Sequence, residues 1–445
     1  MKRLLIFAVV AAMSMTAFAQ GMREEIKANP EKVAGVYRLY PTEFADLTPA
    51  PKGYKPFYIS HYGRHGSRYI LHNHKFDNVF KVFVAADKAG SLTPFGKEIY
   101  GRMQRIAEVC QGLAGDLTPL GRQQHRGIAK RMYEGYPDIF RHNPRITAVS
   151  TIVPRCLLSM NSFTNELLRH DASLDISIDT GAKHMPYLNP YYRDNSVALA
   201  AHIDKYRYPV GPWVDGWYAF RRSVVDNTRL LHSLFAAEFA DNLEFADDFV
   251  INLFRVTVNT PNTPANVDMS DIFTADEKYT WWRLINSVFY HEKGPSGTGG
   301  GFLSEVTANL LKQLVDDAAD KVAAAEPAVT LRFGHDGVLM GLYNTMRLRG
   351  WSEKAASFEE IEQTWHDFDI PMASNMQWIF YRNAKTGDVI VKMLINEEEA
   401  EFPIESDIKP YYRWNDVKAF YDKVLSEQTL YRFDKEGDYH YTGKK

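Results

Sequence analysis

Cysteine is scarce in this chain, whose 445 residues contain only Cys110 and Cys156. This scarcity excludes a disulfide-rich scaffold, and neither cysteine lies in a cluster typical of a metal centre. A single bridge between the two is possible, and two separate buried thiols agree with the sequence at least as well.

The chain also lacks a strong net charge. Its 52 basic and 55 acidic side chains leave a net charge of −3, so no general positive field attracts nucleic acid. An anionic ligand must then be attracted by a local group of bases. After the first twenty residues no segment has the run of about 20 apolar residues that a membrane-spanning helix requires. We therefore expect neither nucleic acid nor membrane as a partner.

The amino terminus has the pattern of a secretory signal peptide. Lys2 and Arg3 give a positive start, residues 4–12 are apolar, and Ala17-Phe18-Ala19 forms a small-x-small cleavage site. The apolar stretch is too short for a membrane anchor. We expect residues 1–19 to be removed and the mature protein to be exported, to the periplasm or outside the cell.

A conspicuous motif follows a β-rich run at residues 57–62. It reads Arg64-His65-Gly66-Ser67-Arg68. A strand followed by a glycine-rich turn presents side chains at the carboxyl edge of an α/β sheet. Each arginine can bind two phosphate oxygens with its planar fork. An imidazole between two such forks is placed to attack the phosphorus atom that they position, which is nucleophilic catalysis by histidine.

Two more strands end in polar residues of the same kind. Residues 145–150 are β-branched and precede Arg155, and residues 328–333 precede His335 and Asp336. Parallel strands bring their carboxyl ends to one crevice, so we expect these three edges to converge. Arg64, Arg68, Arg155 and His335 would bind the phosphate. Asp336 would protonate the leaving oxygen and later take a proton from water.

Each of these residues also has an ordinary explanation. Asp336 could simply cap the helix that follows it, and Arg155 could be a surface charge. His61 and His65 are spaced as metal ligands can be, but no cysteine or carboxylate completes a site, so we expect no metal and no cofactor. The joint occurrence of these residues on three strand ends favours the catalytic interpretation.

These motifs carry a resemblance to a known family. Arg64-His65-Gly66-Ser67-Arg68 resembles the RHGxR signature of the histidine phosphatases, in the branch of acid phosphatases and phytases. Residues 117–124 resemble the LTxxGxxQ segment of that family, and residues 371–375 its P-x-A-x-N hairpin. These features are most similar to inositol-polyphosphate phosphatases. The acid motif, however, reads His335-Asp336-Gly337, whereas that subgroup usually has HAE.

The resemblance implies an α/β fold with a mostly parallel sheet flanked by helices, as in phosphoglycerate mutases, and a largely helical insertion. We place the phosphatase core at residues 20–164 and 302–445. The insertion is expected at residues 165–301, which are aromatic and helical in period and end in a glycine-rich linker at 294–301. Bases gather at the start of this insertion, and we expect Lys183, His184 and Arg193 to contact the substrate.

The sequence therefore predicts an exported phosphomonoesterase that acts through a phosphohistidine on His65. The expected substrate is a small phosphomonoester, preferably a multiply phosphorylated inositol. A broad acid phosphatase is the alternative. Less favoured are a phosphotransferase or mutase, because phosphorylated sugar intermediates are cytoplasmic, and a phosphate-ligand binder, because binding alone needs no Asp336.

Overall fold

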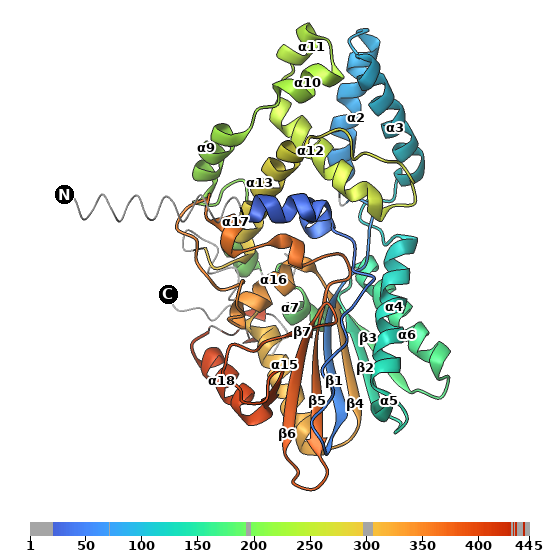
Figure 1. The fold of residues 1–445 in the computed structure, drawn as a ribbon, viewed down its shortest axis with the longest axis vertical. Helices are drawn as coiled ribbons and strands as arrows, with labels where there is room; N and C mark the ends of the chain where they lie inside the picture. Colours follow the sequence, from blue (N-terminus) through green and yellow to red (C-terminus); the bar gives the residue numbers. More distant parts are fainter. Residues whose placement is uncertain are drawn as a thin grey trace, which may run out of the picture.

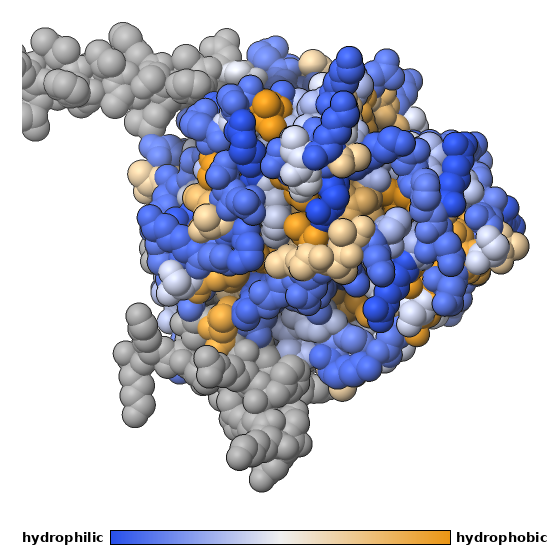
Figure 2. All heavy atoms as spheres, turned by 90° about the horizontal axis from the view of Figure 1, so that it is seen from below, coloured by the Kyte–Doolittle hydropathy of each residue, from blue (hydrophilic) through white to orange (hydrophobic). Residues whose placement is uncertain are grey.

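The computed structural model describes residues 21–70, 72–192, 197–296, 306–428, 430, 432–433 and 439–440. The predicted signal peptide, Arg193 and most of the predicted glycine-rich linker lie outside these residues. The molecule has a lower part built on a sheet and an upper part built of helices (Figure 1). Seen from below, its surface is mainly hydrophilic, with apolar side chains showing between the polar ones (Figure 2). Within the described ranges no helix is long and apolar enough to cross a membrane.

One mixed sheet forms the lower part, in the order β3-β2-β4-β1-β5-β6-β7, with β8 paired to β6. The neighbours β3, β2, β4 and β1 pair in parallel, whereas β5 is antiparallel to β1, and β6 to β5. The predicted strands and the predicted hairpin are present; this hairpin makes the sheet mixed rather than mostly parallel. The strands are β1 (Tyr54–Arg64), β2 (Arg145–Ser150), β3 (Ile176–Thr180), β4 (Ala328–Gly334), β5 (Asn375–Asn383), β6 (Val389–Ile395), β7 (Glu398–Ala400) and β8 (Tyr411–Arg413).

Helices cover both faces of the sheet, which is why all of β4 and most of β1 are buried. On one face α4 (Pro119–Gly135) and α6 (Pro154–His170) pack against Ile59 and Leu331. On the other, α15 (Ala308–Ala324) and α18 (Trp414–Ser426) pack against Tyr58 and Phe380 (Figure 1). Each fully buried leucine of such an interface contributes about 1.5–3 kcal/mol to the hydrophobic stabilisation.

The helical upper part is assembled from two separate segments. Residues 73–110 and residues 214–293 both contribute to it, and Leu92 and Phe235 join them by a β-bridge. The main helices are α2 (Asn73–Lys88), α3 (Pro94–Cys110), α9 (Val214–Val224), α10 (Thr228–Leu234), α11 (Ala237–Asp241), α12 (Ala246–Asn259) and α13 (Ala275–Lys293). The remaining elements include η1 (Pro30–Tyr37), α5 (Pro137–Phe140), η2 (Ala182–His184), α7 (Met185–Leu188), α8 (Val197–Asp204), η4 (Thr260–Asn262), α16 (Asp336–Thr345), α17 (Ile361–Thr364), η5 (Asp367–Asp369), β9 (Arg432–Phe433) and β10 (Tyr439–His440).

This arrangement corrects the boundaries predicted for the insertion at 165 and 301. Strand β3 lies inside that range but pairs with β2 in the sheet. Helix α2 lies in the range predicted as core, yet its Phe83 packs on Phe235 and Phe249, with ring centroids 5.6 and 5.8 Å apart. The apolar period of α2 predicts a buried stripe, but periodicity alone does not say which element covers it.

Local signals in the sequence agree with the structure at several helix starts. Thr93 and Thr118 cap α3 and α4, each accepting a hydrogen bond from the backbone three residues later, and a proline follows each of them. Thr274 and Glu277 form a reciprocal capping box at the start of α13. Cys110 and Cys156 are not bonded to each other.

Candidate active site

Strand register brings the predicted catalytic residues to one edge of the sheet. Arg64 at the end of β1 lies opposite Gly334 at the end of β4. The backbone N–H of His65 donates to the carbonyl of Gly334 over 3.0 Å. The rings of His65 and His335 meet edge to face, with centroids 5.8 Å apart. Arg155, which follows β2, lies 3.5 Å from His335. The three strand ends therefore converge as predicted.

The start of α4 holds the loop that carries His65. A Cβ atom on Gly66 would lie 2.4 Å from the carbonyl oxygen of Gly121, and one on Gly121 would lie 2.3 Å from that of Ser67. Thr118 donates its hydroxyl to the Ser67 carbonyl, and the Gln124 side-chain oxygen accepts from the Ser67 N–H over 2.8 Å. These contacts explain why the LTxxGxxQ segment needs its threonine, glycine and glutamine.

The imidazole of His65 is oriented by its own loop. Nδ1 lies 2.9 Å from the carbonyl oxygen of Gly66, which can only accept, so Nδ1 carries the proton and Nε2 carries a lone pair. Burial, followed by the charges of Arg155, Arg64 and Arg68, holds the pKa of His65 well below its usual value. The ring is therefore neutral, as a nucleophile must be.

Three guanidinium groups surround this ring. Arg64 is fully buried and donates to the carbonyls of Val36 and Ile370 over 2.6 and 2.9 Å. Among the described residues, the Nε atoms of Arg64, Arg68 and Arg155 are buried without a hydrogen-bond partner. Buried cations with unused donors indicate an anion site, since leaving them unpaired is costly.

His335 and Asp336 lie where β4 passes into α16. His335 is the N-cap residue, and its Nδ1 is 3.5 Å from a terminal nitrogen of Arg155. Burial and then the charge of Arg155 lower the pKa of His335 to about 3. Asp336 is the first residue of α16, accepts from the Gly337 N–H over 2.7 Å and pairs with Arg64 over 2.8 Å. The helix start thus supplies one interaction of Asp336 and the arginine supplies the other.

The charge state of Asp336 depends on these arginines. Burial alone would favour the neutral acid, but Arg64 and Arg68 hold the pKa of Asp336 well below its usual range. The carboxyl is therefore ionised before a ligand binds. A phosphate dianion bound to Arg64 and Arg68 would offset their charge and raise the pKa of Asp336, which lets the residue act as an acid in the complex.

Two bases of the helical part, which were not predicted from the sequence, lie near the site. Burial would raise the pKa of Tyr37, yet the charges of Arg68, Lys75 and Arg255 lower it. Lys75 lies on α2 and Arg255 on α12, so both helical segments add positive charge beside Arg68. In the sequence these residues are single bases within helices and belong to no motif.

The predicted substrate contacts at the start of the insertion are differently placed. Lys183 is 68% exposed and pairs with Asp179 over 2.6 Å. His184 lies 3.0 Å from the same carboxylate and also bonds Tyr187. Arg193 lies outside the described residues. A substrate role for Lys183, His184 and Arg193 stays a prediction.

His61 lies in the core, where it packs between Phe163 and Phe333. Burial lowers its pKa to about 3. The described part of the chain holds no group of three or more His, Cys, Asp or Glu side chains placed to bind a metal ion. His61 is therefore a residue of the hydrophobic core.

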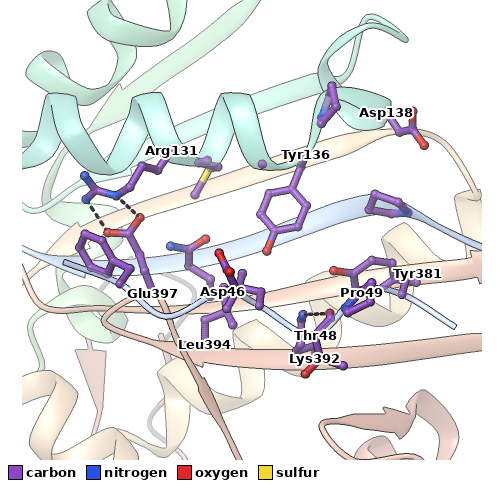
Figure 3. Close-up of a pocket in the computed structure, with 18 of the residues that line it drawn as sticks. Asp46, Thr48, Pro49, Arg131, Tyr136, Asp138, Tyr381, Lys392, Leu394 and Glu397 are labelled. Atoms are coloured by element: carbon purple, nitrogen blue, oxygen red, sulfur yellow. Dashed lines mark hydrogen bonds and ion pairs between the residues drawn. The ribbon is translucent and has the colours of Figure 1, made fainter. Parts of the chain in front are cut away.

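A surface pocket of about 590 Å³ lies away from these residues, between α4, the loop at 44–50 and strands β5 and β6 (Figure 3). Three of its charged side chains, Arg131, Glu397 and Lys392, are bonded within the protein. Arg131 holds Glu397 by two hydrogen bonds, and Lys392 bonds the Thr48 carbonyl (Figure 3). We therefore place the chemistry at His65 and not in this pocket.

Comparison with known proteins finds an inositol polyphosphate phosphatase among the curated relatives. No protein-family model matches the chain. Multiple inositol polyphosphate phosphatase 1 of Gallus gallus is 23% identical over 356 residues, which are 74% of this chain and 77% of that protein.

Solved structures show the fold. The multiple inositol polyphosphate phosphatase of Bifidobacterium longum, in complex with inositol hexasulfate, has a TM-score of 0.74 at 18% identity, covering 88% of this chain and 97% of its own. The phytase of D. castellii has a TM-score of 0.64 at 16% identity, and the match covers 90% of this chain and 86% of the phytase chain. The resemblance predicted from the motifs is thus confirmed: this chain is similar in sequence to an inositol polyphosphate phosphatase and in fold to such a phosphatase and to a phytase.

Proposed function

We propose that this protein hydrolyses phosphate monoesters by passing the phosphoryl group to His65 and then to water. One observation carries the proposal. Gly66 holds the Nδ1 proton of His65, so Nε2 offers its lone pair amid buried guanidinium groups whose Nε atoms have no partner among the described residues. This combination joins a neutral nucleophile to an anion site.

In the first step Nε2 forms a bond to phosphorus while the ester P–O bond breaks. The electron pair of that bond goes to the leaving oxygen, which takes a proton from Asp336. Arg64, Arg68, Arg155 and His335 bind the phosphoryl oxygens and stabilise the charge that they carry in the transition state.

In the second step water attacks the phosphohistidine. The Asp336 carboxylate accepts a proton from this water, a new P–O bond forms, and the P–N bond breaks with its electron pair returning to Nε2. Inorganic phosphate leaves and both residues regain their initial states. The arginines supply the positive charge for both steps, so the reaction as written requires no metal ion.

The substrate class that fits best is an inositol polyphosphate. The relatives bear that name, and one of them binds inositol hexasulfate. Lys75 and Arg255 extend the positive charge of the site beyond Arg68, where further phosphates of such a substrate would lie. A protein of net charge −3 needs such local bases to attract a polyanion.

A substrate panel tests this function. Phosphate release is measured for inositol hexakisphosphate, glycerol 2-phosphate and p-nitrophenyl phosphate, with the wild type and His65→Ala. We expect the highest kcat/KM for the inositol ester and no turnover by His65→Ala. A preference for the simple monophosphates would assign a broad acid phosphatase instead.

Export is part of the same proposal. The first 19 residues have the charge and apolar pattern of a signal peptide. Mass spectrometry of the protein purified from an expressing cell should give a chain that begins at Gln20. Full-length protein retained in the cytoplasm would contradict this assignment.

A further inference from the structure

A buried lysine of the helical part takes no role in the chemistry described above. Lys293 is the last residue of α13 and is only 6% exposed. Its Nζ lies 3.4 Å from the ring centroid of Tyr191 and has no hydrogen-bond partner within the described part of the chain. The aromatic ring offsets only part of the cost of burying an ammonium group.

This lysine reaches the start of α16, beside the general acid. A Cβ atom on Gly337 would lie 3.0 Å from Cε and 3.8 Å from Nζ of Lys293. The third position of the His335-Asp336-Gly337 motif is therefore small where Lys293 fills the space. The amino-terminal end of a helix carries partial positive charge, so the fold gains nothing from a cation here.

The neighbouring charges do not offset the cost of burying the Lys293 ammonium group. Burial and the nearby Arg207 lower its pKa to about 7, while Glu292 and Asp336 act in the opposite direction. Asp336 already accepts from Arg64 and from the Gly337 N–H. A buried cation beside Asp336, which itself pairs with Arg64, indicates that an anionic group of the ligand completes the surroundings of Lys293.

We propose that Lys293 is a substrate-binding residue that donates to a second phosphate of the substrate, next to the one that is transferred. This inference rests on the proposed function. The transferred phosphate is held by the arginines and His335 at the sheet edge, whereas Lys293 comes from the helical part and lies beside Asp336, which serves the leaving oxygen. On a polyphosphate, the part of the substrate that is attached to the leaving oxygen bears the next phosphate. Lys293 lies on that side of the site.

The protonation of Lys293 gives a readout that a structural role would not. A bound anion favours the ammonium form, so affinity should fall as the pH rises through about 7. Of its neighbours, His291 has its pKa lowered by burial to about 4, that of Tyr191 is raised by burial, and that of Asp336 is held far below its usual range. Arg207 and Glu292 are the other charged groups that act on Lys293.

The experiment measures the Kd of inositol hexasulfate by calorimetry from pH 5.5 to 8.5. This probe has no group that titrates in the range. A step in Kd with pH therefore reports the titration of a group of the protein. The proteins are the wild type, Lys293→Met, Lys293→Arg and Lys312→Met. The last removes one charge at an exposed ion pair on α15 and controls for net charge. A lost charge-assisted hydrogen bond should raise Kd about 10- to 100-fold.

We expect Lys293→Met to weaken binding by this amount at pH 6 and to lose the step near pH 7. Lys293→Arg should bind tightly up to pH 8.5, since its guanidinium does not titrate. Turnover gives a second arm, in which Lys293→Met should lose about 10-fold more kcat/KM on inositol hexakisphosphate than on p-nitrophenyl phosphate.

Unchanged binding in Lys293→Met, or equal losses on both esters, would overturn the inference. If Lys293→Met does not fold, as judged by circular dichroism, a pH step that persists unchanged in Lys293→Arg would overturn it. Failure of the wild type to release phosphate from either ester would refute the proposed function, while the calorimetry would still decide the role of Lys293.

Discussion

Arg64 and Asp336 form an ion pair before any substrate binds, with Nη2 of the arginine 2.8 Å from the carboxylate. In the proposed reaction, Arg64 therefore both binds phosphate and keeps the general acid ionised until the substrate arrives. When a phosphate dianion pairs with the Arg64 guanidinium, it offsets the charge of the arginine. The pKa of Asp336 then rises, and the carboxyl can take up the proton that it later donates. The fold therefore couples protonation of Asp336 to occupation of the site.

Asp336→Asn should separate the acid role from phosphate binding. An alkoxide leaving group needs a proton, whereas a nitrophenolate leaves without one. We expect kcat to fall about 10²- to 10⁴-fold on glycerol 2-phosphate and much less on p-nitrophenyl phosphate. Steady-state kinetics on the two esters check this, and equal losses would count against the acid role.

Gly121→Ala should disturb the catalytic loop without touching a catalytic side chain. Its Cβ would lie 2.3 Å from the Ser67 carbonyl oxygen, so the loop and α4 must move apart. We expect a loss of about 1–3 kcal/mol in the free energy of unfolding. Displacement of His65 by the order of 1 Å should lower kcat on the order of 100-fold.

Gly101→Ala is the matched control for that substitution. Gly101 lies within α3, and a Cβ there would meet no atom within 4 Å. Alanine in a helix interior should stabilise the protein by about 0.5–1 kcal/mol and leave kcat unchanged. Thermal unfolding and p-nitrophenyl phosphate turnover compare the two variants. Similar behaviour of both would show that the contact between Gly121 and Ser67 is unimportant.

Asp367 should make the stability of the fold depend on pH. This carboxyl is fully buried, accepts from the Trp282 indole over 2.9 Å, and burial raises its pKa to about 7. Between the unfolded pKa near 4 and about 7, the folded state holds a proton that the unfolded state has lost. Stability therefore falls as pH rises through this window, by up to about 1.4 kcal/mol per pH unit.

Asp367→Asn removes this proton uptake. Chemical denaturation at pH 4.5, 5.5, 6.5 and 7.5 should show a shallower fall of the free energy of unfolding for the variant than for the wild type. The comparison cancels the contributions of other titrating groups. Parallel curves for the two proteins would mean that Asp367 keeps an ordinary pKa in the fold.

Chelation should leave the activity unchanged. The reaction as proposed draws its positive charge from Arg64, Arg68 and Arg155, so no step requires a metal ion. Turnover of p-nitrophenyl phosphate is measured after dialysis against EDTA. A strong loss that zinc or magnesium restores would replace this mechanism with a metal-assisted one.

The meeting of the candidate site residues at one sheet edge could be predicted from the sequence because each follows a strand with a strong local signal. The β-branched runs before Arg155 and His335 and the glycines around His65 make the strand ends visible, and parallel pairing then brings these ends together. The caps Thr93 and Thr118 were visible for a similar reason, since threonine before proline is a local helix start.

Features that depend on tertiary packing could not be predicted in the same way. The apolar stripe of α2 can be read from the sequence. That this stripe packs on α12 and not on the sheet depends on α12 residues that are distant in sequence, such as Phe249. Lys75, Arg255 and Lys293 look like ordinary helix charges, because their position beside the site is a property of the folded chain. Conversely, Lys183 was predicted as a substrate contact because bases gather around it in the sequence, but in the structure it pairs with Asp179 of the same segment.

The proposed reaction depends on His65 as the carrier of the phosphoryl group. Wild-type protein is mixed with inositol hexakisphosphate, quenched within milliseconds under alkaline denaturing conditions that preserve phosphohistidine, and digested for mass spectrometry. We expect an acid-labile phosphate on the peptide that contains His65, at a level that reaches a steady state before the first turnover ends. Turnover that proceeds undiminished in His65→Ala, with no phosphate found on the wild-type peptide, would contradict it.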